Sequence, residues 1–131
     1  MKKSYKLQRV ISIMKSLKIG KLKLKSPLFL APMVDVTDLP FRLLCRRAGA
    51  AMAYTEMVYV DALLHENAST LRMVKSCAED KPLGLQITGN SIEEFEKFVS
   101  QKKLWKDFDL SLIHISEPTR LLSISYAVFC L

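Results

Sequence analysis

Strand-like and helix-like segments alternate along most of this chain, and this alternation restricts the possible folds more than any other feature. Short apolar runs occupy residues 28–33, 52–57 and 83–88, and a fourth run begins at residue 108. A segment with helical signals follows each of the first three, so one strand and one helix recur about every 25–30 residues. This order predicts an α/β fold in which helical crossovers join parallel strands.

Two of the expected helices have clear start signals. Thr37 or Asp38 can accept hydrogen bonds from the free amides of a helix that begins directly afterwards. Ser91 and Glu94 form a capping box for a later helix. Gly49 suits the left-handed backbone that often ends a helix.

Each of these helices is expected to turn an apolar face toward a core. The residues that share a helical face are Phe41, Leu44, Cys45 and Ala48 in the first helix and Ile92, Phe95, Phe98 and Val99 in the later one. A further helix is expected within residues 61–75. Asn67, Ser69 and Thr70 are poor helix formers, so the centre of that helix is uncertain.

Two architectures are compatible with alternating strands and helices. One is an open, doubly wound sheet, and the other is a (β/α)8 barrel. No G-x-G-x-x-G motif follows the first strand, which argues against a dinucleotide-binding sheet.

Positive charge is concentrated near the N-terminus. Residues 1–25 contain nine Lys or Arg and no Asp or Glu, while the whole chain carries a formal charge of +7. Residues 1–16 read as a basic extension, and residues 17–24 alternate in the manner of a short exposed hairpin or edge strand. The charge alone allows a small basic nucleic-acid-binding protein as an alternative function.

Cysteine content and hydropathy favour a cytoplasmic protein. The three cysteines show no C-x-x-C pair and no spacing typical of a metal site, so we expect no bound metal. An odd number of cysteines without a secretion signal indicates a reducing compartment. No apolar run approaches the roughly 20 residues that a membrane-spanning helix needs, so we also expect no membrane association.

Four motifs in order resemble those of tRNA-dihydrouridine synthases. They are residues 30–42 (LAPMVDVTDLPFR), 55–57 (TEM), 67–73 (NASTLRM) and 85–89 (LQITG). The resemblance covers residues 17–110, and four motifs at the right spacing are far more specific than one. It implies that these residues are the N-terminal portion of a TIM (β/α)8 barrel, with about three βα units.

The resemblance also implies a flavoprotein that reduces uridine in tRNA to 5,6-dihydrouridine. FMN is the implied cofactor, NAD(P)H the reductant and tRNA the substrate. The implied FMN contacts are Pro32, Met33 and Val34 after the first strand and Gln86 near the end of the third. These residue types suit a flavin, because Met offers a polarisable surface to a flat ring and an amide can both donate and accept at its edge.

Other interpretations of single residues remain open. Met33 at a strand end is more often a packing residue than a cofactor contact, and Gln86 could bond only to its neighbours. Glu56 could be a barrel-interior carboxylate or a site residue, and the sequence does not decide. The arginines at positions 42, 46 and 47 favour a solvated helix face over a tRNA-binding patch.

The resemblance stops near residue 110. In the family, the fourth strand leads to a Gly-Cys-Pro motif that supplies the catalytic cysteine, and no such motif follows Asp109 here. We therefore assign no catalytic residue, and we expect residues 1–131 alone to be inactive. The later flavin-phosphate contacts of the family are absent as well.

Residues 111–131 have a separate interpretation. Residues 110–120 resemble one reading frame of a common transposase sequencing adapter, and residues 124–131 resemble the flow-cell primer that follows it. We therefore divide the chain into an extension (1–16), a partial FMN-binding barrel domain (17–110) and a non-native tail (111–131). The alternative is a genuine, divergent strand pair, since the tail alternates and is rich in β-branched residues.

Another FMN barrel, such as a dihydroorotate dehydrogenase, is the competing enzyme. The segment 37–42 (TDLPFR) favours the synthase.

Overall fold

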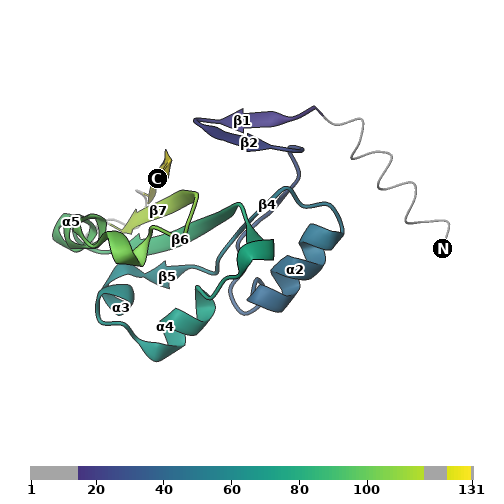
Figure 1. Cartoon of the computed structure of the whole chain (residues 1–131). Helices are drawn as coiled ribbons and strands as arrows, with labels where there is room; N and C mark the ends of the chain where they lie inside the picture. Colours follow the sequence, from purple (N-terminus) through teal and green to yellow (C-terminus); the bar gives the residue numbers. More distant parts are fainter. Residues whose placement is uncertain (1–14, 117–123, 131) are drawn as a thin grey trace.

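The protein forms one layered α/β structure, and the computed structural model describes residues 15–116 and 124–130 (Figure 1). Its main sheet has the order β3-β4-β6-β7-β8, with β5 also paired to β6. The strands are β3 (Phe29–Leu30), β4 (Met52–Tyr54), β5 (Val58–Tyr59), β6 (Leu83–Gly89), β7 (Leu110–Ser116) and β8 (Ile124–Cys130).

Helices connect the parallel strands. They are α2 (Leu39–Arg47), α3 (Val60–Leu64), α4 (Ala68–Met73) and α5 (Ile92–Ser100), with short 3-10 turns η1 (Ala78–Asp80) and η2 (Lys102–Leu104). The pairs β3–β4, β4–β6 and β6–β7 are all parallel, and their spatial order equals their order in the chain. Sequential neighbours without a reversal are the arrangement of a (β/α)8 barrel, which confirms the predicted fold class.

The predicted helix starts are confirmed by their caps. The Phe41 amide donates to Asp38 Oδ1 at 3.0 Å, and the Glu94 amide donates to Ser91 Oγ at 3.2 Å. Gly49 has a φ of 113°, as its place after α2 predicted.

The uncertain helix within residues 61–75 is two helices. Glu66 has a φ of 51°, which ends the first helix, and the Asn67 side chain caps the second by accepting from the amides of Ser69 and Thr70. The polar residues that made the centre of the helix uncertain therefore lie at the point where one helix ends and the next begins.

Side chains of β6 alternate between two cores. Leu85 and Ile87 point to the helices and pack with Leu63, Phe95 and Phe98. Gly84, Gln86 and Thr88 therefore face the opposite, concave side of the sheet. The ring of Tyr54 lies where a Cβ on Gly84 would stand, so only glycine fits there without displacing the ring.

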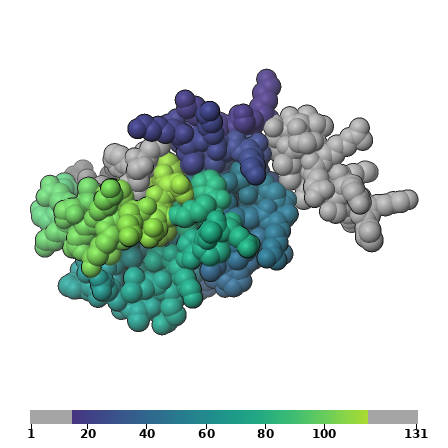
Figure 2. Space-filling model, in the orientation of Figure 1, coloured from purple at the N-terminus to yellow at the C-terminus, as the bar shows by residue number. Residues whose placement is uncertain are grey.

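A β-hairpin closes the end of the sheet where the strands begin. It consists of β1 (Leu17–Ile19) and β2 (Leu22–Leu24), joined at Gly20 with a φ of 55°. Its Leu24 packs with Met52 and Leu110 on the concave side. In Figure 1 the hairpin lies on one side of the sheet and α2, α3 and α4 on the other, and Figure 2 shows it as an outer edge of the molecule. The predicted hairpin is confirmed.

Several expected core positions are exposed. The run 28–33 was expected to be buried on both faces, but β3 is short and half-buried because its other edge has no neighbouring strand in the described chain. Leu44 is 61 % exposed, and Ile92 and Val99 are also exposed. These outward residues lie on helix faces that no other described element covers.

The prediction that the three arginines of α2 form a solvated face is wrong for two of them. Arg42 is completely buried, and Arg46 is nearly so, because both side chains bind Asp80 of η1. Only Arg47 is exposed. The partner acid lies 38 residues from Arg42, so helical periodicity carried no signal of it.

The C-terminal strands pair over their whole length. Strand β7 runs parallel to β6, with cross-strand partners from Gly84 and Leu110 to Gly89 and Ile115. Strand β8 runs antiparallel to β7. A strand pair is the geometry that the alternation in residues 111–131 favours. The assignment of these residues to a non-native tail concerns their origin, and it stays a prediction.

Candidate functional site

The candidate site lies where the parallel strands end. The segments after β3, β4 and β6 meet at one edge of the sheet, because parallel strands have their carboxyl ends on the same side. In an α/β barrel this edge carries the functional groups. The sequence-predicted residues Pro32, Met33 and Val34 follow β3. Gln86 was expected near the end of its strand, but it is the central residue of β6.

The loop after β3 is closed by one buried hydroxyl. The Met33 amide donates to Thr37 Oγ1 at 3.0 Å, and the same hydroxyl donates to the Met33 carbonyl at 2.9 Å. The Thr37 amide also donates to the Met33 carbonyl at 3.0 Å. Thr37 is completely buried, so its two bonds hold the backbone at Met33 in a fixed turn.

Glu56 ties the same loop to the end of β4. Its Oε2 accepts a hydrogen bond of 2.7 Å from the Asp35 amide, and Asp35 has the left-handed φ of 60°. Glu56 is only 5 % exposed. A charge-assisted bond to a backbone amide is stronger than a neutral one, so this carboxylate supports a turn that asparagine, aspartate or glycine alone adopt readily.

A third contact joins the end of β4 to β6. The backbone N–H of Gln86 donates to Thr55 Oγ1 at 3.1 Å. The Thr55 hydroxyl in turn donates to the backbone carbonyl of Glu56 at 3.0 Å. The three sequence-predicted positions after β3 and Gln86 are therefore linked through Thr55 and Glu56. Sequence reasoning left Glu56 unassigned; its only signal was its place in the motif at residues 55–57.

The Gln86 side chain lies on the concave face beside β7. Its Nε2 is 2.8 Å from His114 Nε2. Since an amide nitrogen only donates, the histidine nitrogen accepts in this arrangement. Gln86 is half-buried and keeps its amide oxygen as a further acceptor at the edge of the sheet.

Large apolar side chains are exposed at this edge. They are Met33, Val34, Val36, Met57 and Tyr59. Exposed apolar groups next to a buried carboxylate and a half-buried amide resemble the lining of ligand sites, where few polar groups orient a mostly apolar ligand. The residues fit an isoalloxazine ring, which has a flat apolar face and a hydrogen-bonding edge.

One group on the concave face has a shifted pKa. Burial raises the pKa of the Tyr54 phenol above its usual value of 10.0, because desolvation disfavours the phenolate. The phenol therefore stays neutral through physiological pH.

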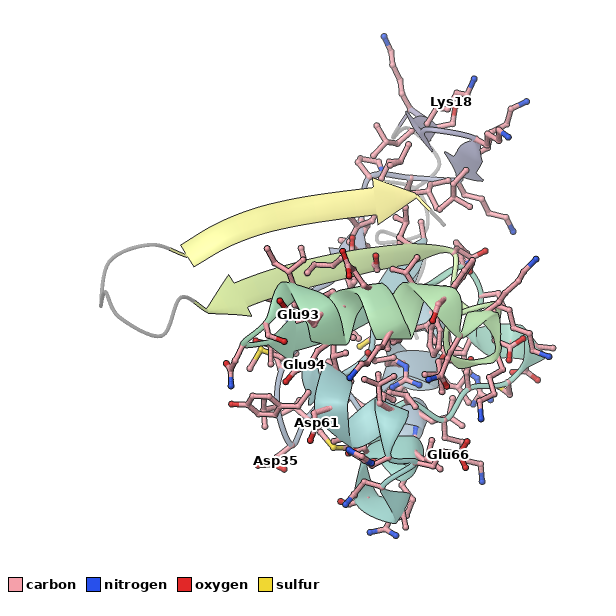
Figure 3. The ribbon with its side chains drawn as sticks, turned by 90° about the vertical axis from the view of Figure 1, so that its left-hand side faces the viewer. Lys18, Asp35, Asp61, Glu66, Glu93 and Glu94 are labelled. Carbon is pink, nitrogen blue, oxygen red and sulfur yellow. The ribbon has the colours of Figure 1, made fainter. Side chains whose placement is uncertain are left out.

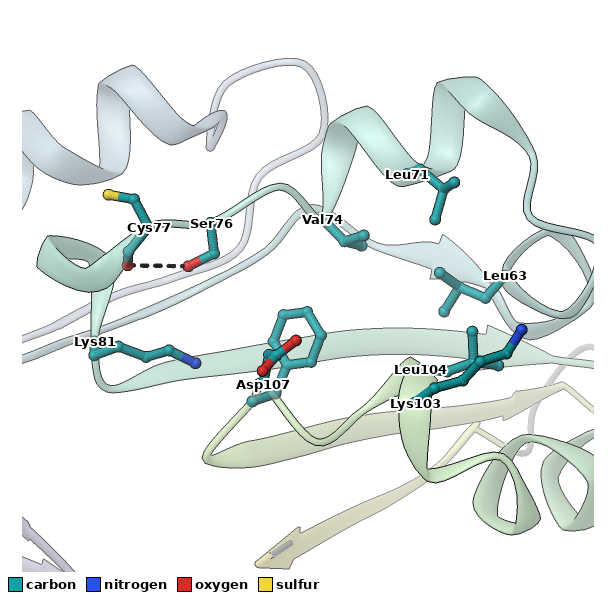
Figure 4. A pocket seen from close by; sticks show the side chains of 10 residues that line it. Leu63, Leu71, Val74, Ser76, Cys77, Lys81, Lys103, Leu104 and Asp107 are labelled. Atoms are coloured by element: carbon teal, nitrogen blue, oxygen red, sulfur yellow. Dashed lines mark hydrogen bonds between the residues drawn. The ribbon is translucent and has the colours of Figure 1, made fainter.

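A cavity in the described structure is separate from this edge. It has a volume of about 370 Å³ and lies among α3, α4 and η2 (Figure 4). Lys81 and Phe108 line the cavity from positions just before β6 and β7, at the end of the sheet where the strands begin. At its rim, the backbone carbonyl of Cys77 accepts a hydrogen bond of 3.4 Å from Ser76 Oγ. It shares no residue with the predicted site.

Two searches of the described residues were negative. Residues 15–116 and 124–130 contain no helix long and apolar enough to cross a membrane. The same residues hold no group of three or more His, Cys, Asp or Glu arranged to bind a metal ion.

Sequential parallel strands with the polar and apolar groups gathered at their carboxyl ends define the class as an α/β barrel protein. A model of the family described as dihydrouridine synthase (Dus) matches residues 29–107. The chain belongs to the dihydrouridine synthase family. The match favours this family over the dihydroorotate dehydrogenase alternative.

Curated relatives agree with the family match. The chain is 47 % identical over 77 residues to tRNA-dihydrouridine synthase B of Pseudomonas aeruginosa, covering 58 % of this chain and 23 % of that protein. It is 41 % identical over 81 residues to the Pseudomonas putida protein of the same name, and the match covers 61 % of this chain and 24 % of that protein. It is 39 % identical over 88 residues to tRNA-dihydrouridine synthase B of Vibrio cholerae, and the match covers 59 % of this chain and 27 % of that protein.

The chain spans about a quarter of the length of these relatives. No solved structure matches it.

Proposed function

We propose that this chain is part of an FMN-dependent tRNA-dihydrouridine synthase, an oxidoreductase that converts uridine in tRNA to 5,6-dihydrouridine. The observation that carries the proposal is the family match over residues 29–107, together with relatives named tRNA-dihydrouridine synthase B. FMN and NAD(P)H are the proposed cofactor and reductant, and tRNA is the proposed substrate. A cytoplasmic location is proposed with them.

Pro32, Met33, Val34 and Gln86 are the proposed FMN contacts. Bound FMN supplies hydride transfer to the uracil C5–C6 double bond. Exposed Met33 and Val34 offer an apolar surface to the ring, and the Gln86 amide offers a donor and an acceptor to its edge. Thr37 keeps the backbone at Met33 in place for this contact.

The division of the chain is part of the proposal. Residues 17–110 are the barrel portion, residues 1–16 an extension and residues 111–131 a non-native tail. The family match lies wholly inside the barrel portion. Long-read sequencing of the source DNA across the codons for residues 105–131 tests the tail. A frame that continues from Asp109 into a Gly-Cys-Pro motif supports the division, and a genuine stop codon after Leu131 contradicts it.

Flavin binding tests the site residues directly. Adding the 131-residue chain to FMN should quench flavin fluorescence, and Gln86→Leu should weaken binding about fivefold, since one hydrogen bond contributes about 1 kcal/mol. Gln101→Leu is the matched control, because Gln101 follows α5 on the helix side. Equal affinities for both variants would remove Gln86 from the site.

The activity is tested in the source cell. Deleting the gene should abolish dihydrouridine at one or more tRNA positions, measured by mass spectrometry of digested tRNA. An unchanged dihydrouridine content would contradict the proposed reaction, unless a second synthase modifies the same position, so the deletion is repeated in a strain without other such genes.

A further inference from the structure

Exposed lysines lie on the β1–β2 hairpin and directly beside it, and together they form its lysine face. The exposed members are Lys15, Lys18, Lys21, Lys23 and Lys25. No acidic residue occurs before Asp35 in the sequence. Figure 3 shows Lys18 projecting from the hairpin away from the sheet.

Two of these lysines oppose each other directly. Lys18 and Lys23 are cross-strand partners in the hairpin. Like charges directly opposite on an antiparallel pair are destabilising, so their placement is unfavourable for folding alone. In residues 15–116, none of the five lysines has an ion-pair partner, whereas Lys81 and Lys103 each have one.

The hairpin holds these charges in a fixed arrangement. Its other face carries Leu17, Ile19, Leu22 and Leu24, which pack against the start of the sheet, and Leu24 is buried. Lys18 and Lys23 are directly opposite on the two strands, so they point to the same face with their Cβ atoms about 5 Å apart. A packed hairpin therefore loses little conformational freedom when a ligand binds its outer face.

Negative charge lies at the opposite end of the sheet. Asp35, Asp61 and Glu93 follow β3, β5 and β6, and Figure 3 shows them well away from Lys18. The hairpin end of the sheet therefore carries the more positive potential, which attracts a polyanion.

We propose that the lysine face of the hairpin binds backbone phosphates of RNA, and that it holds a part of the tRNA remote from the reacting uridine. This rests on the proposed function for the choice of tRNA. The composition of the face favours RNA over a membrane, because apolar burial adds to membrane affinity and the apolar residues of this hairpin point inward.

Binding of an unmodified tRNA transcript to the 131-residue chain, measured by fluorescence anisotropy at several salt concentrations, tests the face. The triple variant Lys18→Gln, Lys23→Gln, Lys25→Gln should lower the slope of log affinity against log salt by about 2–3, roughly 0.7–0.9 per phosphate contact. The matched control is Lys97→Gln, Lys102→Gln, Lys106→Gln, which removes three exposed lysines from α5 and the segment after it. The control should keep the slope.

Each result has a defined meaning. A loss confined to the hairpin variant supports the proposal. Equal losses in both variants, no change in either, or no RNA binding by the unaltered chain overturn it. A hairpin variant that loses binding only to phosphatidylserine vesicles, while binding tRNA normally, also overturns it.

Flavin binding separates this proposal from the proposed function. FMN quenching should be the same in the hairpin variant and the unaltered chain, because the lysines lie at the other end of the sheet. Lysine-dependent RNA binding without any flavin quenching would contradict the flavoprotein and leave the lysine face standing. Normal flavin quenching without lysine-dependent RNA binding would support the flavoprotein and contradict the lysine face.

Discussion

Two basic regions of this molecule have opposite environments. Arg42 and Arg46 of α2 are buried around Asp80, whereas Lys18 and Lys23 of the hairpin are exposed and face each other. Arg42 alone donates to Asp80 at 2.8 Å, to the Thr37 carbonyl at 2.6 Å and to the Lys75 carbonyl at 2.7 Å.

The contrast follows from the geometry of the two side chains. A guanidinium presents several donors in a planar fork, so one arginine can satisfy a carboxylate and two carbonyls at once. An ammonium is a strongly hydrated point charge, and it stays in water unless a partner compensates for desolvation. Buried arginines therefore join α2 to η1, whereas exposed lysines remain available to a ligand.

The largest effect is expected where the buried charges lose their partner. Asp80→Asn leaves Arg42 and Arg46 without a counter-charge, which should lower the free energy of unfolding by about 3–5 kcal/mol. Urea unfolding followed by circular dichroism measures it. Asp107→Asn, at an exposed aspartate, is the control. A loss no greater than that of the control would show that Asp80 does not hold the two arginines.

Arg42→Lys tests the fork itself and should have the next largest effect. Lysine keeps the charge but cannot reach Asp80, Thr37 and Lys75 together. We expect a loss of about 1.5–3 kcal/mol, the range for hydrogen bonds to charged groups, in the same unfolding measurement. Arg47→Lys, on the exposed side of α2, should change stability little. Similar losses for both variants would argue that charge alone matters.

A smaller effect of opposite sign is expected in the hairpin. Lys18→Glu replaces a like-charged cross-strand pair with Lys23 by an attractive one, which should raise stability by about 0.2–1 kcal/mol. Lys21→Glu is the control, because Lys21 lies in the turn without a cross-strand partner. The stabilisation should disappear at high salt. A destabilised Lys18→Glu chain would contradict the described register.

The smallest effect concerns an exposed lysine that does have a partner. Lys103 Nζ donates to Glu66 Oε1 at 2.5 Å, and this hydrogen bond, with the charge of Lys103, holds the pKa of Glu66 below its usual value of 4.5. The pair therefore stabilises the fold at neutral pH, and the contribution is lost as pH falls through the lowered pKa.

Glu66→Gln should lower stability slightly at neutral pH and make stability less dependent on pH in this acid range, so that the difference from the unaltered chain disappears at low pH. Unfolding at a series of acid pH values measures it, with Glu96→Gln as the control, since Glu96 is exposed on α5 and has no ion pair in the described residues. Identical pH profiles for the two variants would show that the ion pair with Lys103 contributes nothing in solution.

Much of the fold could be predicted because its signals are local. The cap of Asp38, the cap of Ser91 and the left-handed residue Gly49 after α2 each depend on residues within a few positions. Strand order follows from the alternation, since sequential parallel strands with short crossovers become neighbours. The predicted flavin positions after β3 and on β6 are joined through Thr55 and Glu56 at the end of β4, and the resemblance, not the spacing, selected them.

The rest depended on contacts between distant segments. The bond from Asp35 to Glu56 spans 21 residues, and the bond from Arg42 to Asp80 spans 38. Exposure of Leu44 could not be predicted either, because the helical pattern identifies an apolar face but not whether another element covers it.

The sequence by itself determined the order of strands and helices, their caps and the family. Tertiary structure decided which charges are buried and paired, and which of two basic regions faces water. The physical reason is that hydrogen bonds in turns and caps form between near neighbours in the chain, whereas burying a charge requires a partner that only the packed fold brings within reach.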